Sequence, residues 1–197
     1  MAPMPTARSA HMVATVGGKI YAIGGYSSSY LKVVEEYNPA TNTWATKAPM
    51  PTPRSDAAVA VVNGKIYVMG GDTGGGSATN RTEVYDPSAD TWTNLASMIN
   101  GRKSMAAAVI NNKIYTLGGT KSSTALRNNE EYDPSSNNWA AKAQMPTARS
   151  WLSAQSANGK VYAIGGWSGL LSLTANEEFN PSSNSWVTKA ALPTATD

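Results

Sequence analysis

A Gly-Gly pair recurs four times along this chain at nearly constant spacing. The pairs are Gly24-Gly25, Gly70-Gly71, Gly118-Gly119 and Gly165-Gly166. Successive pairs are separated by 46, 48 and 47 residues. A fixed period of roughly 20 to 50 residues is the signature of solenoids, propellers and arrays, in which one supersecondary unit packs on the next. The 197 residues are therefore expected to form one domain of four similar units.

Each Gly-Gly pair has the same neighbours in the sequence. Lys-Ile-Tyr or Lys-Val-Tyr precedes it, and an aromatic-Asx-Pro turn and then a lone tryptophan follow it. The turns begin at Tyr37, Tyr85, Tyr132 and Phe179, and the tryptophans are Trp44, Trp92, Trp139 and Trp186. In these features the chain resembles the kelch repeat over nearly its whole length. The resemblance implies an all-β fold, a kelch-type β-propeller with blades at approximately 4–49, 50–97, 98–144 and 145–193.

Strand signals come in a fixed order within each unit. A small, apolar segment, as at 11–16 and 57–62, leads into a two-residue turn rich in Gly and Asn. These residues tolerate the positive φ of a primed hairpin turn, so the second strand, which ends at Gly-Gly, runs antiparallel to the first. A third strand, as at 33–37, ends at the Asx-Pro turn, and the fourth begins at the tryptophan. Each blade is therefore predicted to hold four antiparallel strands.

Residue types that return in every unit are expected to build the blade. The small side chains of the first strands suit the crowded axis of a propeller, and the recurrent aromatic residues suit the wider space between blades. An arginine and a glutamate also recur, which predicts internal ion pairs or backbone clamps. The arginines are Arg8, Arg54, Arg102 and Arg149, and the glutamates are Glu35, Glu83, Glu130 and Glu177.

Two segments of each unit differ between the repeats, and strand direction places both on one face. They are the loop after Gly-Gly and the residues after the recurrent arginine. Their mixture of aromatic, hydroxyl and charged side chains is typical of adaptable recognition surfaces. The kelch resemblance implies more, because in the kelch adaptors of ubiquitin ligases the serine after the arginine and the residue after Gly-Gly contact a peptide. The expected ligand-binding residues are Ser9, His11, Tyr26, Ser55, Asp56, Asp72, Lys103, Ser104, Thr120, Ser150, Trp151 and Trp167. Lys103 departs from the pattern, because it stands where the other repeats have serine.

These observations favour a non-catalytic binding or scaffold module whose partner is a protein or peptide. A carbohydrate ligand, or a sugar mutarotase-like activity, is the alternative, because some kelch propellers act on sugars. With no cysteine and His11 as the single histidine, the sequence predicts no metal site, no cofactor and no catalytic residue. Charged residues are 15% of the chain and the net charge of +3 is spread without a basic run, so no nucleic-acid partner is expected. No signal peptide or membrane-spanning segment is predicted, and the compartment stays open.

The number of units raises the question of how the ring closes. Kelch propellers usually have six or seven blades, and an open arc of four leaves an apolar face at each end. Three solutions are open: a closed ring of four, two arcs joined by two-fold symmetry, or a longer parent whose further blades cover the faces. Equal spacing favours self-association, so a homodimer is expected.

Overall fold

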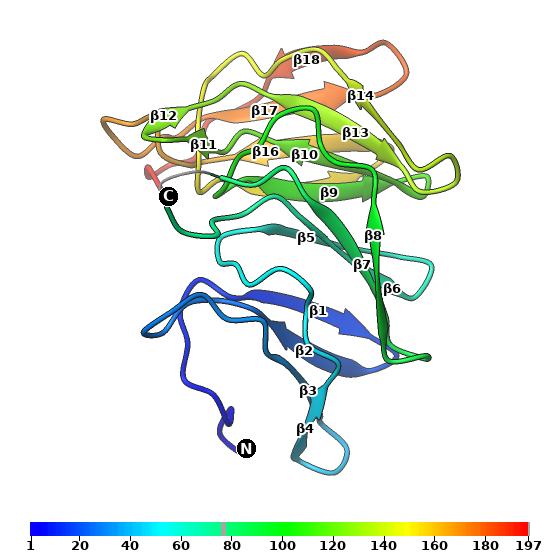
Figure 1. Cartoon of the computed structure of the whole chain (residues 1–197). Helices are drawn as coiled ribbons and strands as arrows, with labels where there is room; N and C mark the ends of the chain where they lie inside the picture. Colours follow the sequence, from blue (N-terminus) through cyan, green and yellow to red (C-terminus); the bar gives the residue numbers. More distant parts are fainter. Residues whose placement is uncertain (76–77, 197) are drawn as a thin grey trace.

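The computed structural model describes residues 1–75 and 78–196, and its regular structure there is entirely β (Figure 1). Each repeat forms one antiparallel sheet of four strands. The first sheet holds β1 (Met12–Val16), β2 (Lys19–Ile23), β3 (Val34–Asn38) and β4 (Thr43–Lys47). The second holds β5 (Ala58–Val62), β6 (Lys65–Met69), β7 (Thr82–Asp86) and β8 (Thr91–Leu95). The third holds β9 (Ala106–Ile110), β10 (Lys113–Leu117), β13 (Asn129–Asp133) and β14 (Asn138–Ala141). The fourth holds β15 (Ser153–Ala157), β16 (Lys160–Ile164), β17 (Asn176–Asn180) and β18 (Ser185–Thr188).

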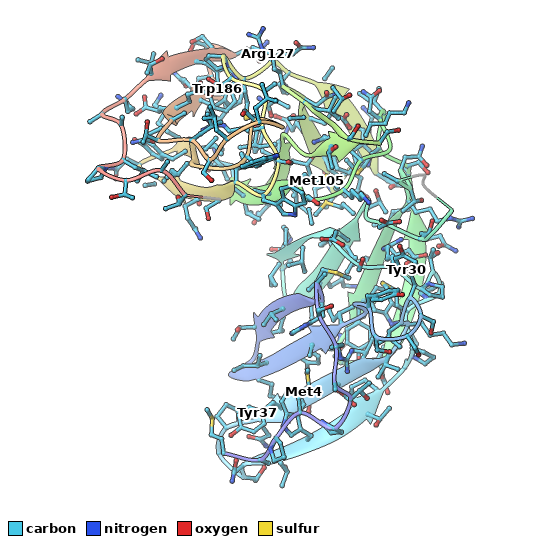
Figure 2. The ribbon with its side chains drawn as sticks, turned by 90° about the vertical axis from the view of Figure 1, so that its left-hand side faces the viewer. Met4, Tyr30, Tyr37, Met105, Arg127 and Trp186 are labelled. Atoms are coloured by element: carbon cyan, nitrogen blue, oxygen red, sulfur yellow. The ribbon has the colours of Figure 1, made fainter. Side chains whose placement is uncertain are left out.

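The sheets are numbered here as blades 1 to 4, and they follow one another along an open arc (Figure 2). The first strand of each blade lies innermost, because β1 packs against β5, β5 against β9, and β9 against β15. No comparable packing joins β15 to β1 in the described part of the chain. The predicted kelch-type blades are therefore confirmed, and the alternative of a closed four-bladed ring is wrong for the single chain.

The predicted hairpin turns are confirmed by their backbone angles. Both central residues have positive φ in all four turns, with values between +49° and +74°, as primed turns require. The turn residues are Gly17-Gly18, Asn63-Gly64, Asn111-Asn112 and Asn158-Gly159. The third blade adds a small hairpin that the sequence pattern did not predict, formed by β11 (Thr120–Lys121) and β12 (Thr124–Ala125).

Three apolar clusters hold successive blades together, as expected for the recurrent aromatic residues. Between blades 2 and 3, for example, Tyr67 and Met69 pack with Tyr132 and Trp139. The Trp139 indole also donates a hydrogen bond to the carbonyl of Ala96, which lies in the segment before blade 3 (2.9 Å). Trp92 and Trp186 make the equivalent bond to Ala48 and Ala143. The tryptophans therefore fasten each blade to the segment that leads into it.

The recurrent arginines and glutamates form the predicted internal ion pairs. Arg54 Nη2 lies 2.9 Å from Glu83 Oε2, and neither side chain has any exposed surface. Arg149 pairs with Glu177 at 2.6 Å and also donates to the carbonyls of Gly165 and Ala163. Arg8–Glu35 and Arg102–Glu130 repeat the arrangement. Each arginine therefore clamps the linker that carries it to the blade that follows.

Candidate binding face

The two variable segments of each repeat lie side by side, as strand direction predicts. An isolated antiparallel bridge joins the residue after the arginine to the residue after Gly-Gly in every blade. The pairs are Ser9 with Tyr26, Ser55 with Asp72, Lys103 with Thr120, and Ser150 with Trp167. Eight of the residues singled out in the sequence are thus brought together two by two on one face of the arc.

A backbone ladder connects the same segments from blade to blade. The amide of Asp56 donates to the carbonyl of Ala10, Ser104 to Asp56, and Trp151 to Ser104, at 2.8–3.0 Å. The four residues of the ladder, one from each repeat, have φ between +50° and +55°. This left-handed backbone conformation is uncommon for residues other than glycine. The ladder positions are equivalent in the repeats but hold four different side chains: Ala10, Asp56, Ser104 and Trp151.

A central hollow of about 380 Å³ lies along this ladder and is lined by all four blades. Its polar lining comes from His11, Asp56 and Ser104, and Trp151 stands at its edge. His11 Nδ1 and Ser104 Oγ are buried and have no hydrogen-bond partner among the described residues. Burial, followed by the nearby Arg8 charge, lowers the pKa of His11, so its imidazole is neutral at pH 7. The hollow therefore offers neutral polar groups and one carboxylate.

A second, lateral hollow of about 360 Å³ adjoins the first between blades 3 and 4. Trp151 and Trp167 both line it, together with Lys103 and a series of small polar residues. The polar residues are Thr120, Ser122, Ser123 and Ser150. Trp151 is 54% exposed, and the loop after Trp167 carries Leu170 and Leu171, which are 87% and 56% exposed. Aromatic and aliphatic surface is therefore concentrated on the blade-4 side of the face.

Some of the expected ligand-binding residues have internal partners. Lys103 forms an ion pair with Asp72 of the neighbouring blade, and the Asp72 carboxylate also accepts the Gly74 amide. Burial alone would raise the pKa of Asp72, but the hydrogen bonds from Lys103 and Gly74 outweigh it and lower the pKa. The side chain that breaks the serine pattern thus ties blade 3 to blade 2. Ser55, Ser150 and Thr120 are buried, whereas Ser9, Tyr26 and Trp151 are exposed.

A third hollow lies on the opposite face, which the sequence pattern did not single out. It measures about 430 Å³ and lies between the hairpin turns of blades 2 and 3. Tyr67, Lys65 and Lys113 line it together with turn residues. The sequence does contain a signal for this hollow, which is a break in the repeat. In three units Glu-Glu directly precedes the aromatic residue of the Asx-Pro turn, whereas blade 2 has Glu83-Val84.

Within residues 1–75 and 78–196, no three His, Cys, Asp or Glu side chains are grouped as a metal site would require. The same residues contain no helix that could cross a membrane.

Four-stranded blades on an arc, each clamped by a buried Arg–Glu pair, define a β-propeller-type repeat protein. Residues 1–166 match the model of the KLHDC2/KLHL20/DRC7 Kelch-repeats domain, and residues 149–193 match that of the Kelch motif. The chain belongs to the kelch-repeat family. The solved structure of YjhT superimposes with a TM-score of 0.84 and 18% sequence identity, covering 98% of this chain and 68% of that one. This likeness shows the fold. No curated protein sequence matches the chain closely enough to count as a relative.

Proposed function

We propose that this kelch domain is a non-catalytic module that binds a protein or peptide through the face just described. The observation that carries the proposal is the placement of Trp151 and Trp167 in one hollow. Neither tryptophan recurs in the other repeats, so neither is required to build a blade. Exposed aromatic anchors surrounded by small hydroxyl groups are typical of protein interfaces. The exposed Leu170 and Leu171 add apolar area that favours a peptide over a sugar.

The test is a Trp151→Ala/Trp167→Ala double variant, measured against peptides selected on an array with the unmodified protein. Binding is expected to weaken at least about thirtyfold, because an aromatic hot spot contributes about 2 kcal/mol or more. Ile99→Ala is the matched control, since Ile99 is also exposed but lies outside both hollows. Unchanged peptide binding by the folded double variant would refute the proposal. Selective binding on a glycan array, with no peptide hits, would instead support the carbohydrate alternative.

We further propose that two copies of the chain associate through the two ends of the arc. Val13 on β1 is 51% exposed, whereas its equivalents in the next two blades, Val59 and Ala107, pack against the preceding blade. Val187 on blade 4 is likewise 53% exposed. Blade 1 of one copy and blade 4 of another can form the same kind of interface that joins successive blades within the chain. A second copy would also extend the ladder and enclose the central hollow.

Light scattering tests this self-association directly. The molar mass is expected to exceed the 20.7 kDa of one chain, and Val13→Asp is expected to reduce it to the monomer value, because a carboxylate would be buried without a partner. Val59→Thr is a milder control at the equivalent position inside the arc. A monomeric mass for the unmodified chain at micromolar concentration would refute the dimer and leave the peptide proposal standing.

A further inference from the structure

Three of the four blades share one polar contact between their second and third strands. A tyrosine on the second strand donates its hydroxyl hydrogen bond to a glutamate on the third strand. The pairs are Tyr21–Glu36 (2.6 Å), Tyr115–Glu131 and Tyr162–Glu178 (2.7 Å). In blades 1 and 3 a lysine at the start of the second strand also contacts this carboxylate. Lys19 Nζ lies 2.7 Å from Glu36, and Lys113 Nζ lies 3.1 Å from Glu131. The chain thus shows repeatedly how this Tyr-Lys donor pair binds a carboxylate.

Blade 2 keeps the two donors but lacks the carboxylate. Val84 stands opposite Tyr67 in the strand register, where the other blades have glutamate. In blade 3 the glutamate is also contacted by Lys142, which directly follows the fourth strand. Blade 2 has Leu95 at the equivalent position, so this lysine is missing as well. The Tyr67 hydroxyl has no hydrogen-bond partner among the described residues, although Tyr67 is only 7% exposed. The ring is buried, but the hydroxyl oxygen is not among the fully buried polar atoms, so this donor is reachable from the hollow that Tyr67 lines.

The 430 Å³ hollow lies where the glutamate is missing. Tyr67 and Lys65 line it from blade 2, and Asn111, Asn112 and Ser135 line it from blade 3. Blade 3 also contributes Lys113 and Asp133, which pair with each other at 3.3 Å. Burial, partly offset by the Lys65 charge, raises the pKa of Tyr67, so the phenol is a proton donor at neutral pH. Space, an accessible phenol donor without a protein acceptor and amide groups are therefore present together.

The existing ion pair of Lys65 is compatible with a second acceptor. Lys65 Nζ lies 2.9 Å from Asp86. In blade 3 the equivalent Lys113 holds both the equivalent Asp133, at 3.3 Å, and Glu131, at 3.1 Å. One lysine at this position therefore binds two carboxylates at once, whereas Lys65 pairs only with Asp86 among the described residues. Asp133, the protein carboxylate in the lining, is paired with Lys113.

We propose that this hollow is a binding site for a small carboxylate-bearing molecule, whose carboxylate takes the place of the missing glutamate between Tyr67 and Lys65. Charge-assisted hydrogen bonds to a carboxylate are about twice as strong as neutral ones, which favours this group over a neutral hydroxyl. The rest of the ligand would lie against Asn111, Asn112 and Ser135, whose amide and hydroxyl groups suit a polar body. The site is on the face opposite the one proposed for peptide binding and is independent of it.

The experiment titrates the full chain, carrying [13C]-labelled tyrosine, with sodium succinate and follows the Tyr67 ring signal by NMR. Tyr67→Phe is expected to weaken succinate binding about tenfold or more, because it removes a hydrogen bond to a charged group. Tyr162→Phe is the matched control, since Tyr162 already has Glu178 as its acceptor, and it is expected to bind succinate normally. For the variants, binding is followed through the Asn111 and Asn112 amide signals.

A second variant supplies the missing carboxylate from within the protein. Val84→Glu/Leu95→Lys restores the residues found in blades 1 and 3, so it is expected to fold and to abolish succinate binding. Trp151→Ala/Trp167→Ala is expected to leave succinate binding unchanged, which separates this site from the peptide face. The proposal is overturned if succinate does not shift the Tyr67 signal, if Val84→Glu/Leu95→Lys binds succinate like the unmodified chain, or if inorganic phosphate binds equally tightly.

Discussion

Replacing Arg54 with alanine is expected to lower the free energy of unfolding by about 3 to 5 kcal/mol, as removing one partner of a buried ion pair does. Arg54 and Glu83 are both fully buried, so the variant would leave a carboxylate inside the protein without its cation. Burial lowers the pKa of Arg54 to about 10, with Glu83 opposing the shift, and the guanidinium therefore remains charged at neutral pH. Urea denaturation followed by tryptophan fluorescence measures the change.

Arg81→Ala is the control for this experiment, because Arg81 is exposed and makes no ion pair among the described residues. It removes the same side chain from the same blade and is expected to change stability by less than about 0.5 kcal/mol. Equal effects of the two substitutions would show that the Arg54–Glu83 pair contributes nothing specific to the fold.

Gly118→Ala is expected to destabilise the chain by at least about 3 kcal/mol, or to prevent folding. Gly118 has a φ of +62°, which costs an L-residue about 1 to 2 kcal/mol. A Cβ atom there would also lie 2.3 Å from the carbonyl oxygen of Arg149, in the linker to the next blade. Because this oxygen belongs to the backbone, the linker itself would have to move, which adds an overpacking cost of about 1 to 3 kcal/mol.

Gly159→Ala separates the two contributions. Gly159 has a similar φ of +70°, but a Cβ atom there would meet nothing within 4 Å. Its substitution is therefore expected to cost only the backbone term of about 1 to 2 kcal/mol. If thermal and urea unfolding give the same loss for both glycines, close approach of the linker is not the reason for the Gly-Gly motif.

The repeat pattern predicted correctly that the two variable segments of each repeat lie on one face, because antiparallel order and the position of Gly-Gly are local properties. It could not predict which side chains remain available there. Lys103 was singled out for a ligand, but its partner Asp72 lies in another blade. The concentration of apolar surface near Trp151 also depends on how blades 3 and 4 meet. Both outcomes depend on contacts between units that are distant in the sequence.

The sequence by itself determined the class of fold, the strand order within each blade, the hairpin turns and the internal Arg–Glu pairs. These features follow from periodicity, turn chemistry and the cost of burying charge, which act in the same way in every repeat. Only the tertiary structure decided the curvature of the arc, the two adjoining hollows on the binding face and the hollow beside Tyr67. Val84 and Leu95 interrupt the repeat in the sequence, but the hollow beside Tyr67 forms only when blade 3 packs against blade 2. The physical reason is that a hollow of this kind forms where two packed blades lack a side chain that would fill the space between them. That space exists only after the blades have packed.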